Sequence, residues 1–403
     1  MMHDVIVVGA RCAGSPIAML LAKRGYQVLL LDRAIFPSDM VMSTHFIHQR
    51  GIACLDRWGL RDQLVATGTP PVQQMMIRIG EVTLVGSPPA VDGETSAFAP
   101  RRVLLDDILV RAAENSGADL REGCRIQRLI FDDGRVVGVQ GVTQAGSSFV
   151  EKARMVIGAD GPASRVAKEV GAEKYARKPA LEATAWIYWE KLPQAGLELH
   201  LADYESIYCF PTSNGSTLVG ANWAMDRFQT VRHDLAHHYF ELLGRAAPEL
   251  AARVANAKRA DDKLHVGSTP NFFRNACGPG WVLLGDAHYK KDPCTAQGIS
   301  DTFCDAEYLA EAIDRGFCGD QDLLRSLQDY EKDRVGWIMP FYELTCQMAT
   351  LAPPEPDVLS IYQILQSTQD DTNAFLGTIT GAVSPSSFFA PENIGRILNG
   401  ARE

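Results

Sequence analysis

Glycines and one aspartate, set around two short apolar runs, form the first pattern in this sequence with chemical meaning. A β-branched run at residues 4–9 leads into a glycine-containing turn at residues 9–14, and a helical segment follows at 15–24. A second apolar run, residues 26–31, ends at Asp32. The order strand, glycine turn, helix, strand and acid is typical of a dinucleotide-binding βαβ unit.

Each part of this unit has a physical task. Gly9 permits the tight turn, Gly14 lets the helix pack closely on the strand, and Asp32 can accept hydrogen bonds from ribose hydroxyls. Free amides at the helix N-terminus can bind a pyrophosphate. Arg11 stands where the usual motif has its middle glycine, so a βαβ unit without a nucleotide site remains the alternative. The residues predicted to bind the cofactor here are Gly9, Arg11, Cys12, Ala13, Gly14, Asp32, Arg33 and Ser43.

Two later strands also end in polar turns. The run at residues 154–159 leads into Asp160-Gly161, and the run at 280–284 leads into Gly285-Asp286. Pro293 follows, and then Gly298 and Ile299 precede an amphipathic segment at 300–315. Glycine at a helix start offers free amides to a polar ligand.

With these three motifs in order, the sequence resembles the FAD-dependent monooxygenases of the p-hydroxybenzoate hydroxylase type over most of the chain. The turn reads G-A-R-x-A-G-S, a variant found in that family. The resemblance implies FAD as cofactor, NAD(P)H as a transient electron donor, and O2 with a small-molecule substrate as reactants. It also implies roles for particular residues. Asp286 would bind the ribityl chain, Gly298 and Ile299 would lie by the flavin ring, and Pro293 would lie on its oxygen-reactive face. The further predicted cofactor contacts are Arg102, Asp160 and Gly285.

The expected fold is mixed α/β: a Rossmann-like FAD/NAD(P)-binding domain, an antiparallel-sheet substrate domain and a helical C-terminal region. The predicted ranges are 1–72, 97–175 and 271–330 for the first, 73–96 and 176–270 for the second, and 331–403 for the third. No second glycine fingerprint follows a strand, so a nicotinamide donor would bind in the shared cleft.

The middle of the chain contains alternating, aromatic-rich segments that predict antiparallel strands joined by a turn at 213–215. We predict that Trp186, Tyr188, Phe210 and Trp223 bind substrate, with sheet core as the alternative for each. The candidate catalytic residues are Pro293, from its expected place at the flavin, and three histidines, because a histidine can relay a proton: His45, His48 and His288. His233 and His237 would share a helix face, but no third ligand is evident, and we predict no metal.

Composition limits the possible partners. The chain has 39 Lys plus Arg and 49 Asp plus Glu, a net charge of −10, which argues against nucleic acid. Its 9 cysteines form no C-x-x-C pair, as expected for a reduced, cytoplasmic protein. No apolar run is long enough for a membrane span. A monomer or homodimer is expected.

The leading functional hypothesis is a monooxygenase that hydroxylates a small aromatic or other electron-rich substrate through a C4a-hydroperoxyflavin. The alternative is a reductase of alkenes resembling geranylgeranyl reductase, with which Tyr208-x-Phe210-Pro211 is compatible. A flavin-dependent halogenase would need an early lysine and a W-x-W-x-I-P segment. This chain has no lysine between Lys23 and Lys152, and its nearest segment is 207–211. A non-catalytic flavin-binding module is the remaining hypothesis.

Overall fold

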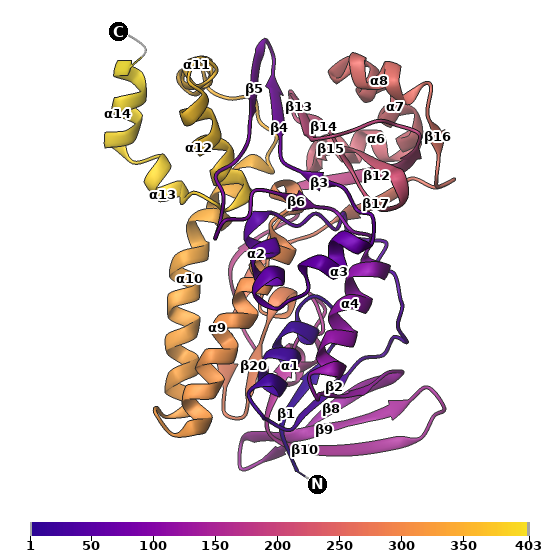
Figure 1. Cartoon of the computed structure of the whole chain (residues 1–403), viewed down its shortest axis with the longest axis vertical. Helices are drawn as coiled ribbons and strands as arrows, with labels where there is room; N and C mark the ends of the chain where they lie inside the picture. The colour runs from indigo at the N-terminus through magenta and orange to yellow at the C-terminus, as the bar shows by residue number, and fades with distance from the viewer. Residues whose placement is uncertain (1, 401–403) are drawn as a thin grey trace.

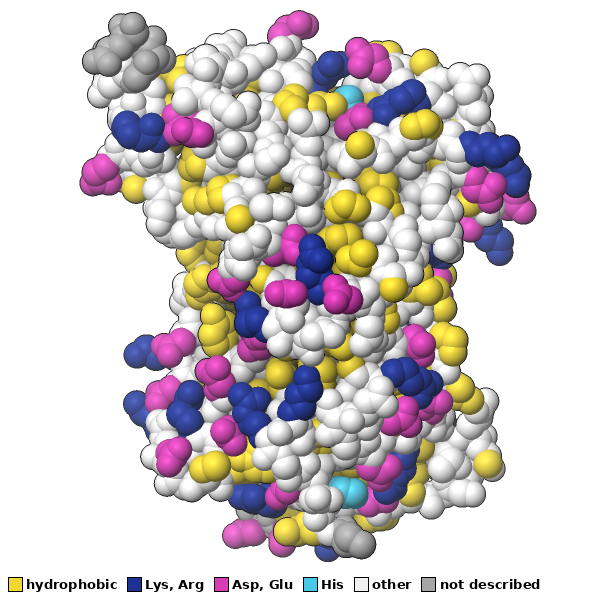
Figure 2. Space-filling model, in the orientation of Figure 1, with side chains coloured by type: hydrophobic (Ala, Val, Ile, Leu, Met, Phe, Trp, Pro, Cys, Tyr) yellow, Lys and Arg dark blue, Asp and Glu magenta, His cyan; other side chains and the backbone are white. Residues whose placement is uncertain are grey.

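The computed structural model describes residues 2–400 and has the mixed α/β fold expected from the sequence. Figure 1 shows parallel strands and the N-terminus in its lower part, with a second sheet and the C-terminal helices above. Figure 2 shows a narrower waist between these two parts, and acidic and basic side chains are interspersed over the lower one. No helix in residues 2–400 is long and apolar enough to cross a membrane.

The lower sheet is built on buried parallel strands, because helices or strands cover both of its faces. Its strand order is β19-β20-β10-β1-β2-β7, and β8 and β9 extend β10 as an antiparallel ribbon. The bounds are β1 (His3–Val8), β2 (Val28–Leu31), β7 (Asp119–Arg121), β8 (Cys124–Asp132), β9 (Arg135–Thr143), β10 (Ser148–Gly158), β19 (Cys277–Gly278) and β20 (Trp281–Leu283).

The register of these strands places the three motifs together. Val8 pairs with both Leu31 and Gly158, and Gly158 pairs with Leu283. The four parallel strands therefore end at the same level. The residues that follow them, including the turns at Gly9 and Gly285, meet at one edge of the sheet, where α/β proteins bind their ligands.

Three helices that border this edge pack on one face of the lower sheet: α1 (Gly14–Lys23), α4 (Arg102–Asn115) and α9 (Gly298–Cys318). The other helices of this part are α2 (Gln49–Arg57), α3 (Arg61–Ala66), α5 (Arg165–Glu169) and α10 (Leu323–Met348). Helix α10 runs beside α9 (Figure 1).

The upper sheet is largely antiparallel, with the strand order β16-β12-β15-β14-β13-β4-β5 and β17 paired to β12. Strands from residues 75–86 thus join the same sheet as those from 182–268. The bounds are β4 (Met75–Ile79), β5 (Val82–Gly86), β12 (Glu182–Glu190), β13 (Leu197–Ala202), β14 (Glu205–Pro211), β15 (Ser216–Ala224), β16 (Lys258–Arg259) and β17 (His265–Ser268). Smaller sheets contain β11 (Lys174–Lys178), β18 (Asn271–Arg274) and β21 (Tyr289–Lys290), and β3 (Pro71–Val72) with β6 (Ala97–Phe98).

Alternation along β12 separates two faces of the upper sheet. Ile187 and Trp189 pack with the helices α6 (Met225–Val231), α7 (Leu235–Ala246) and α8 (Pro248–Val254). Trp186 and Tyr188 point to the opposite face and pack with Phe210. Trp223 packs on the face that α7 covers, so its ring cannot line a pocket on the opposite face of the sheet.

The C-terminal helices pack on β4 and β5 and close that end of the upper sheet. They are α11 (Pro356–Leu365), α12 (Gln369–Thr380), α13 (Pro385–Phe388) and α14 (Pro391–Gly400). A helical region after residue 331 was expected.

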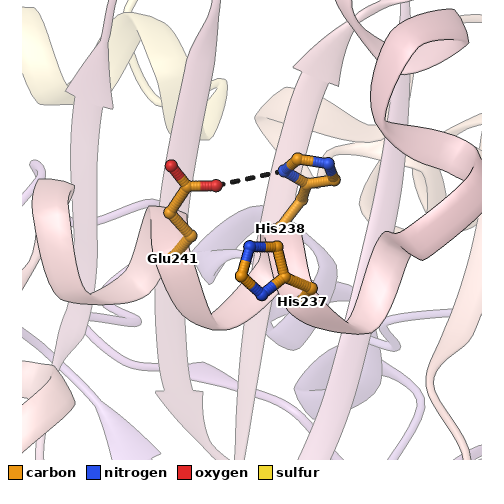
Figure 3. A group of neighbouring side chains, drawn as sticks. All are labelled: His237, His238 and Glu241. Atoms are coloured by element: carbon orange, nitrogen blue, oxygen red, sulfur yellow. Dashed lines mark hydrogen bonds and ion pairs between the residues drawn. The ribbon is translucent and has the colours of Figure 1, made fainter.

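The expectation that His233 and His237 share a helix face is wrong. Asp234 caps α7, its side chain accepting from the amide of His237, and the helix begins at Leu235. Figure 3 shows what lies there instead: His238 Nδ1 faces Glu241 Oε2 at 3.1 Å, with His237 beside them. His237 and Glu241 are exposed, and this group is a polar, solvated helix face.

Candidate active site

The turn after β1 is fixed by its own backbone and by Asp32. Gly9 has φ +101°, and a Cβ there would lie 2.5 Å from the carbonyl oxygen of Ala159. A Cβ on Gly14 would lie 1.6 Å from the carbonyl oxygen of Gly9, so only glycine allows α1 to begin this close to β1. The Asp32 carboxylate accepts from the amides of Ala10 and Ala34, both at 2.7 Å.

Two helix N-termini at this edge fit the polar groups of a flavin dinucleotide. Neither α1 nor α9 has a side-chain cap at its N-terminus. In α1 the amide of Ser15 donates to the carbonyl oxygen of Arg11 and Pro16 has no N–H, so the amides open to a ligand there precede Ser15, whereas those of α9 begin at Gly298. Gly298 is exposed, and a Cβ there would meet no atom within 4 Å. The Cβ of Ala13 and the side chain of Thr302 both lie close to Gly285, which links the first motif, the third motif and α9.

Arg11, the residue in the usual glycine position, binds the protein itself. Its Nη1 donates to Asp106 Oδ2 at 2.5 Å, and its Nη2 donates to Ser38 Oγ at 2.8 Å. Arg102 Nε donates to the other oxygen of Asp106 at 2.9 Å, as does Cys12 Sγ at 3.4 Å. Asp106 is fully buried, so it holds two cationic side chains beside the glycine turn.

The remaining predicted cofactor residues occupy different surroundings. Asp160 Oδ1 accepts from Ser164 Oγ and its Oδ2 from the amide of Arg165, so this carboxylate stabilises the start of α5. Burial raises the pKa of Asp160, against the hydrogen bond from Ser164. Arg33 is exposed, and Ser43 Oγ accepts from the amide of His45.

Asp286 lies at the edge of the site, with about a third of its side chain exposed (35%). Its Oδ2 accepts from Lys290 Nζ at 2.6 Å. Asp286 also belongs to the electrostatic surroundings of buried Arg102. The third motif is therefore linked by charge to the helix start at α4.

A cavity lies between the upper sheet and the segment before α9. Pro293, Thr295 and Ala296 form one wall, and Phe210, Tyr208 and Thr184 form the opposite one. His48 also lines it. Of the predicted site residues, the structure brings Pro293, His48 and Phe210 to this cavity. Ile299 begins the adjoining helix and is partly buried.

His48 holds the segment before α9 in place. Its Nε2 donates to the carbonyl oxygen of Thr295 at 2.9 Å, and its backbone amide donates to Ser300 Oγ at 3.0 Å. Burial lowers the pKa of His48 to about 3, against the hydrogen bond to Thr295, so the ring is neutral near pH 7. His48 therefore acts here as a fixed donor.

His45 has a related environment just outside the cavity lining. Its Nδ1 donates to the carbonyl oxygen of Ala99 at 3.1 Å, and its Nε2 accepts from the hydroxyl of Tyr188 at 2.9 Å. Burial and then the charge of Arg101 lower the pKa of His45 to about 3. Arg101 lies over the Tyr188 ring at 4.2 Å. Tyr188 and Trp186 thus support the aromatic wall from behind Phe210.

His288 is placed away from this cavity. It is fully buried, packs against Phe273, and neither ring nitrogen has a hydrogen-bond partner among residues 2–400. Burial and then the charge of Arg334 hold its pKa well below the ordinary value. A neutral ring enclosed in this way cannot meet a substrate in the cavity, which corrects its selection as a catalytic candidate.

The sequence reasoning missed the polar wall of the cavity. Glu182 and Asn222 line it together with Thr184, whose Oγ1 lies 2.9 Å from the hydroxyl of Tyr208. Glu182 is the first residue of a buried and largely apolar strand. A lone carboxylate in such a position was the signal that could have identified it.

The glycine turn with its acid, the two uncapped helix starts and the Gly285-Asp286 turn together define an FAD-dependent oxidoreductase. A family model described as "FAD binding domain" matches residues 2–335, and the chain belongs to that family. FAD is therefore its cofactor.

Two curated relatives come from different enzyme classes. A tryptophan 2-halogenase of Chondromyces crocatus is 24% identical, and the match covers 98% of this chain and 78% of that protein. A digeranylgeranylglycerophospholipid reductase of Methanococcoides burtonii is also 24% identical, over 82% of this chain and 79% of its own length.

Solved structures share the fold over nearly the whole chain. The flavin-dependent brominase Bmp2 superposes with a TM-score of 0.83 at 17% identity, covering 100% of this chain and 98% of that one. PqsL of Pseudomonas aeruginosa, described as a probable FAD-dependent monooxygenase, gives 0.71 at 18% identity over 94% and 99%.

Proposed function

We propose that this flavoenzyme is a monooxygenase that hydroxylates a small aromatic or other electron-rich substrate, with NAD(P)H as the electron donor. The observation that carries the proposal is the cavity between Phe210 and the Pro293–Ala296 segment. Its lining combines aromatic and aliphatic side chains with a few hydroxyl, amide and carboxyl groups, as expected for a site that binds a ring with one polar substituent.

The residues at the sheet edge would bind and orient the cofactor. Bound FAD, once reduced, supplies the electrons that activate O2. Asp32 and the amides at the start of α1 would hold the adenosine and pyrophosphate. Asp286 would hold the ribityl chain, and the free amides from Gly298 would stabilise negative charge on the ring.

The cavity residues would position the substrate and keep water out. Phe210 offers a ring for stacking, and buried aliphatic side chains from β4, β13 and α12 (Met75, Leu199 and Ile379) exclude water from the reacting atoms. His48 would keep the Pro293–Ala296 segment fixed through its bond to Thr295. Preorganised walls of this kind reduce the reorganisation needed during reaction.

Relatives of this chain include a halogenase and an isoprenoid-lipid reductase, and the cavity favours neither activity. Halogenation in the related class needs a lysine facing the oxidant, and no lysine is among the residues that line this cavity. A reductase of long isoprenoid chains needs an extended apolar channel, whereas the lining of this cavity includes the polar side chains of Glu182, Thr184 and Asn222. Hydroxylation of a small ring is the activity that fits both facts.

The test is the oxidative half-reaction of the holoenzyme. The flavin is reduced anaerobically, mixed with oxygenated buffer and followed by stopped-flow absorbance, with and without a panel of phenols and N–H heteroaromatics. A transient spectrum distinct from both oxidised and reduced flavin, with 18O from 18O2 in a product, is the expected result. Slow, direct reoxidation with every compound, or reduction of an alkene under anaerobic conditions, contradicts the proposal. Bromide-dependent bromination would show the halogenase activity instead.

A further inference from the structure

Two carboxyl groups from distant parts of the chain meet at the polar end of the cavity. Glu182 begins β12 and is 2% exposed, and Asp292 lies between β21 and Pro293 and is 1% exposed. A carboxylate oxygen of each and the Sγ of Cys294 all lie within 4.8 Å of one another. Glu182 lines the cavity, and Asp292 stands behind it.

These carboxyl groups lack the partners that buried carboxylates require. Asp292 Oδ1 accepts from the amide of Cys294 at 3.2 Å. Within residues 2–400, both oxygens of Glu182 and Oδ2 of Asp292 have no hydrogen-bond donor. The nearby lysines are used elsewhere, because Lys290 binds Asp286 and Lys291 binds Asp301. Two facing carboxylates satisfy each other only when they share a proton.

The surroundings indicate where that proton lies. Burial, followed by the charge of Asp292, raises the pKa of Glu182 well above its ordinary value. Burial raises the pKa of Asp292 to about 6, opposed by the proton that Glu182 would share with it. These directions favour the shared proton on Glu182 and the negative charge on Asp292. The other titratable groups facing this pair are Tyr208 on β14, Lys290, Lys291, Cys294 and Cys346 on α10.

A pair in this state can take up one more proton from the cavity. We propose that Glu182 and Asp292 together are the base that deprotonates the substrate, and that the substrate is therefore a phenol or an N–H heteroaromatic. The inference rests on the proposed monooxygenase function and specifies its substrate class.

The proton transfer is balanced within the pair and the substrate. The substrate O–H or N–H bond breaks, and its proton joins the Glu182 oxygen that faces the cavity. The proton already on Glu182 moves to Asp292 Oδ2. The pair becomes neutral, and the substrate becomes an anion whose ring carries more electron density, as an electrophilic oxygen transfer requires.

The same strand supplies a matched control. Glu190 ends β12, lies outside the cavity and is bound by Lys258 at the protein surface. Glu182→Gln removes the proton-accepting oxygen facing the cavity, while Glu190→Gln makes the same chemical change elsewhere. Flavin content and circular dichroism show whether each variant is folded. If Glu182→Gln does not fold, Asp292→Asn serves as the second test.

The probe is 4-nitrophenol, whose ionised form has its own visible absorption, titrated with oxidised holoenzyme below the pH at which the free probe ionises. We expect the ionised fraction of bound probe to exceed that of free probe in wild type and Glu190→Gln. Its ionised fraction should fall about tenfold or more in Glu182→Gln, which corresponds to a rise of about one unit in the pKa of the bound probe. An infrared band of a protonated carboxyl should be present at neutral pH and missing in Glu182→Gln.

Several results would overturn the inference. These are equal ionisation in both variants, binding of the probe only in its neutral form, failure of wild type to bind it, or a stoichiometric metal lost in Glu182→Gln. The probe experiment needs neither O2 nor turnover. Probe ionisation without oxygen transfer would therefore reject the monooxygenase function alone, and oxygen transfer with an unionised probe would reject the base alone.

Discussion

Replacement of Asp292 by asparagine should stabilise the protein above neutral pH. The carboxylate is buried in the native state, and burial raises its pKa from 3.8 to about 6. The folded protein therefore binds this proton more tightly than the unfolded chain does. Between these two pKa values, stability falls as the pH rises, and the loss is complete above about pH 6.

The size of the effect follows from the two pKa values. A rise from 3.8 to about 6 corresponds to about 3 kcal/mol of destabilisation when Asp292 is ionised in the native state. About half of this is already present at pH 5, so on the order of 1 kcal/mol develops between pH 5 and pH 8. Asparagine can still accept from the amide of Cys294 and carries no charge. The variant should therefore gain on the order of 1 kcal/mol on wild type between these pH values.

Urea unfolding of the holoenzyme at pH 5 and pH 8 measures this difference directly. Asp203→Asn is the control, because Asp203 is exposed in the turn between β13 and β14. Its unfolding free energy relative to wild type should change little between the two pH values. The reasoning is refuted if Asp292→Asn loses stability at pH 8, or if its advantage does not grow with pH.

Three further substitutions test the site. Asp286→Ala should purify with less FAD, its affinity reduced about 10- to 100-fold because a charge-assisted hydrogen bond is lost; full flavin content would contradict the assignment. Gly14→Ala should lower the unfolding free energy by about 3 kcal/mol or more, since its Cβ would overlap the carbonyl oxygen of Gly9; a normal melting temperature would contradict this. Tyr188→Phe should cost about 1 kcal/mol in thermal unfolding by leaving His45 Nε2 without its donor, and an unchanged midpoint would show that this bond is not stabilising.

The parts of the site that depend on local pattern were predictable from the sequence. A glycine turn after a strand fixes its own geometry, and parallel strands bring their carboxyl ends to one edge. The order of the three motifs therefore predicted the FAD-binding fold. The helix start at Gly298 was predictable for the same reason.

Features that depend on register or on distant pairing were not predictable. Trp223 pairs with Ala183 across β12 and β15, and that register decides which face its ring occupies. Arg11 finds its partner Asp106 at a separation of 95 residues. Nothing local to residues 9–14 indicates that contact, so the sequence left the role of Arg11 open.

The carboxyl pair depends both on a local strand pattern and on a contact between distant parts of the chain. Glu182 starts a strand of the upper sheet, and Asp292 follows a strand that leads from the FAD edge towards α9. An isolated buried carboxylate is costly, and a well-packed apolar pair at the same place would be more stable. The carboxyl pair keeps this destabilising charge, faces a cavity and adjoins the predicted flavin edge. Acids with perturbed pKa values in such positions often act as catalysts. The stability gained by Asp292→Asn and the probe ionisation lost in Glu182→Gln should therefore be two measurements of the same proton.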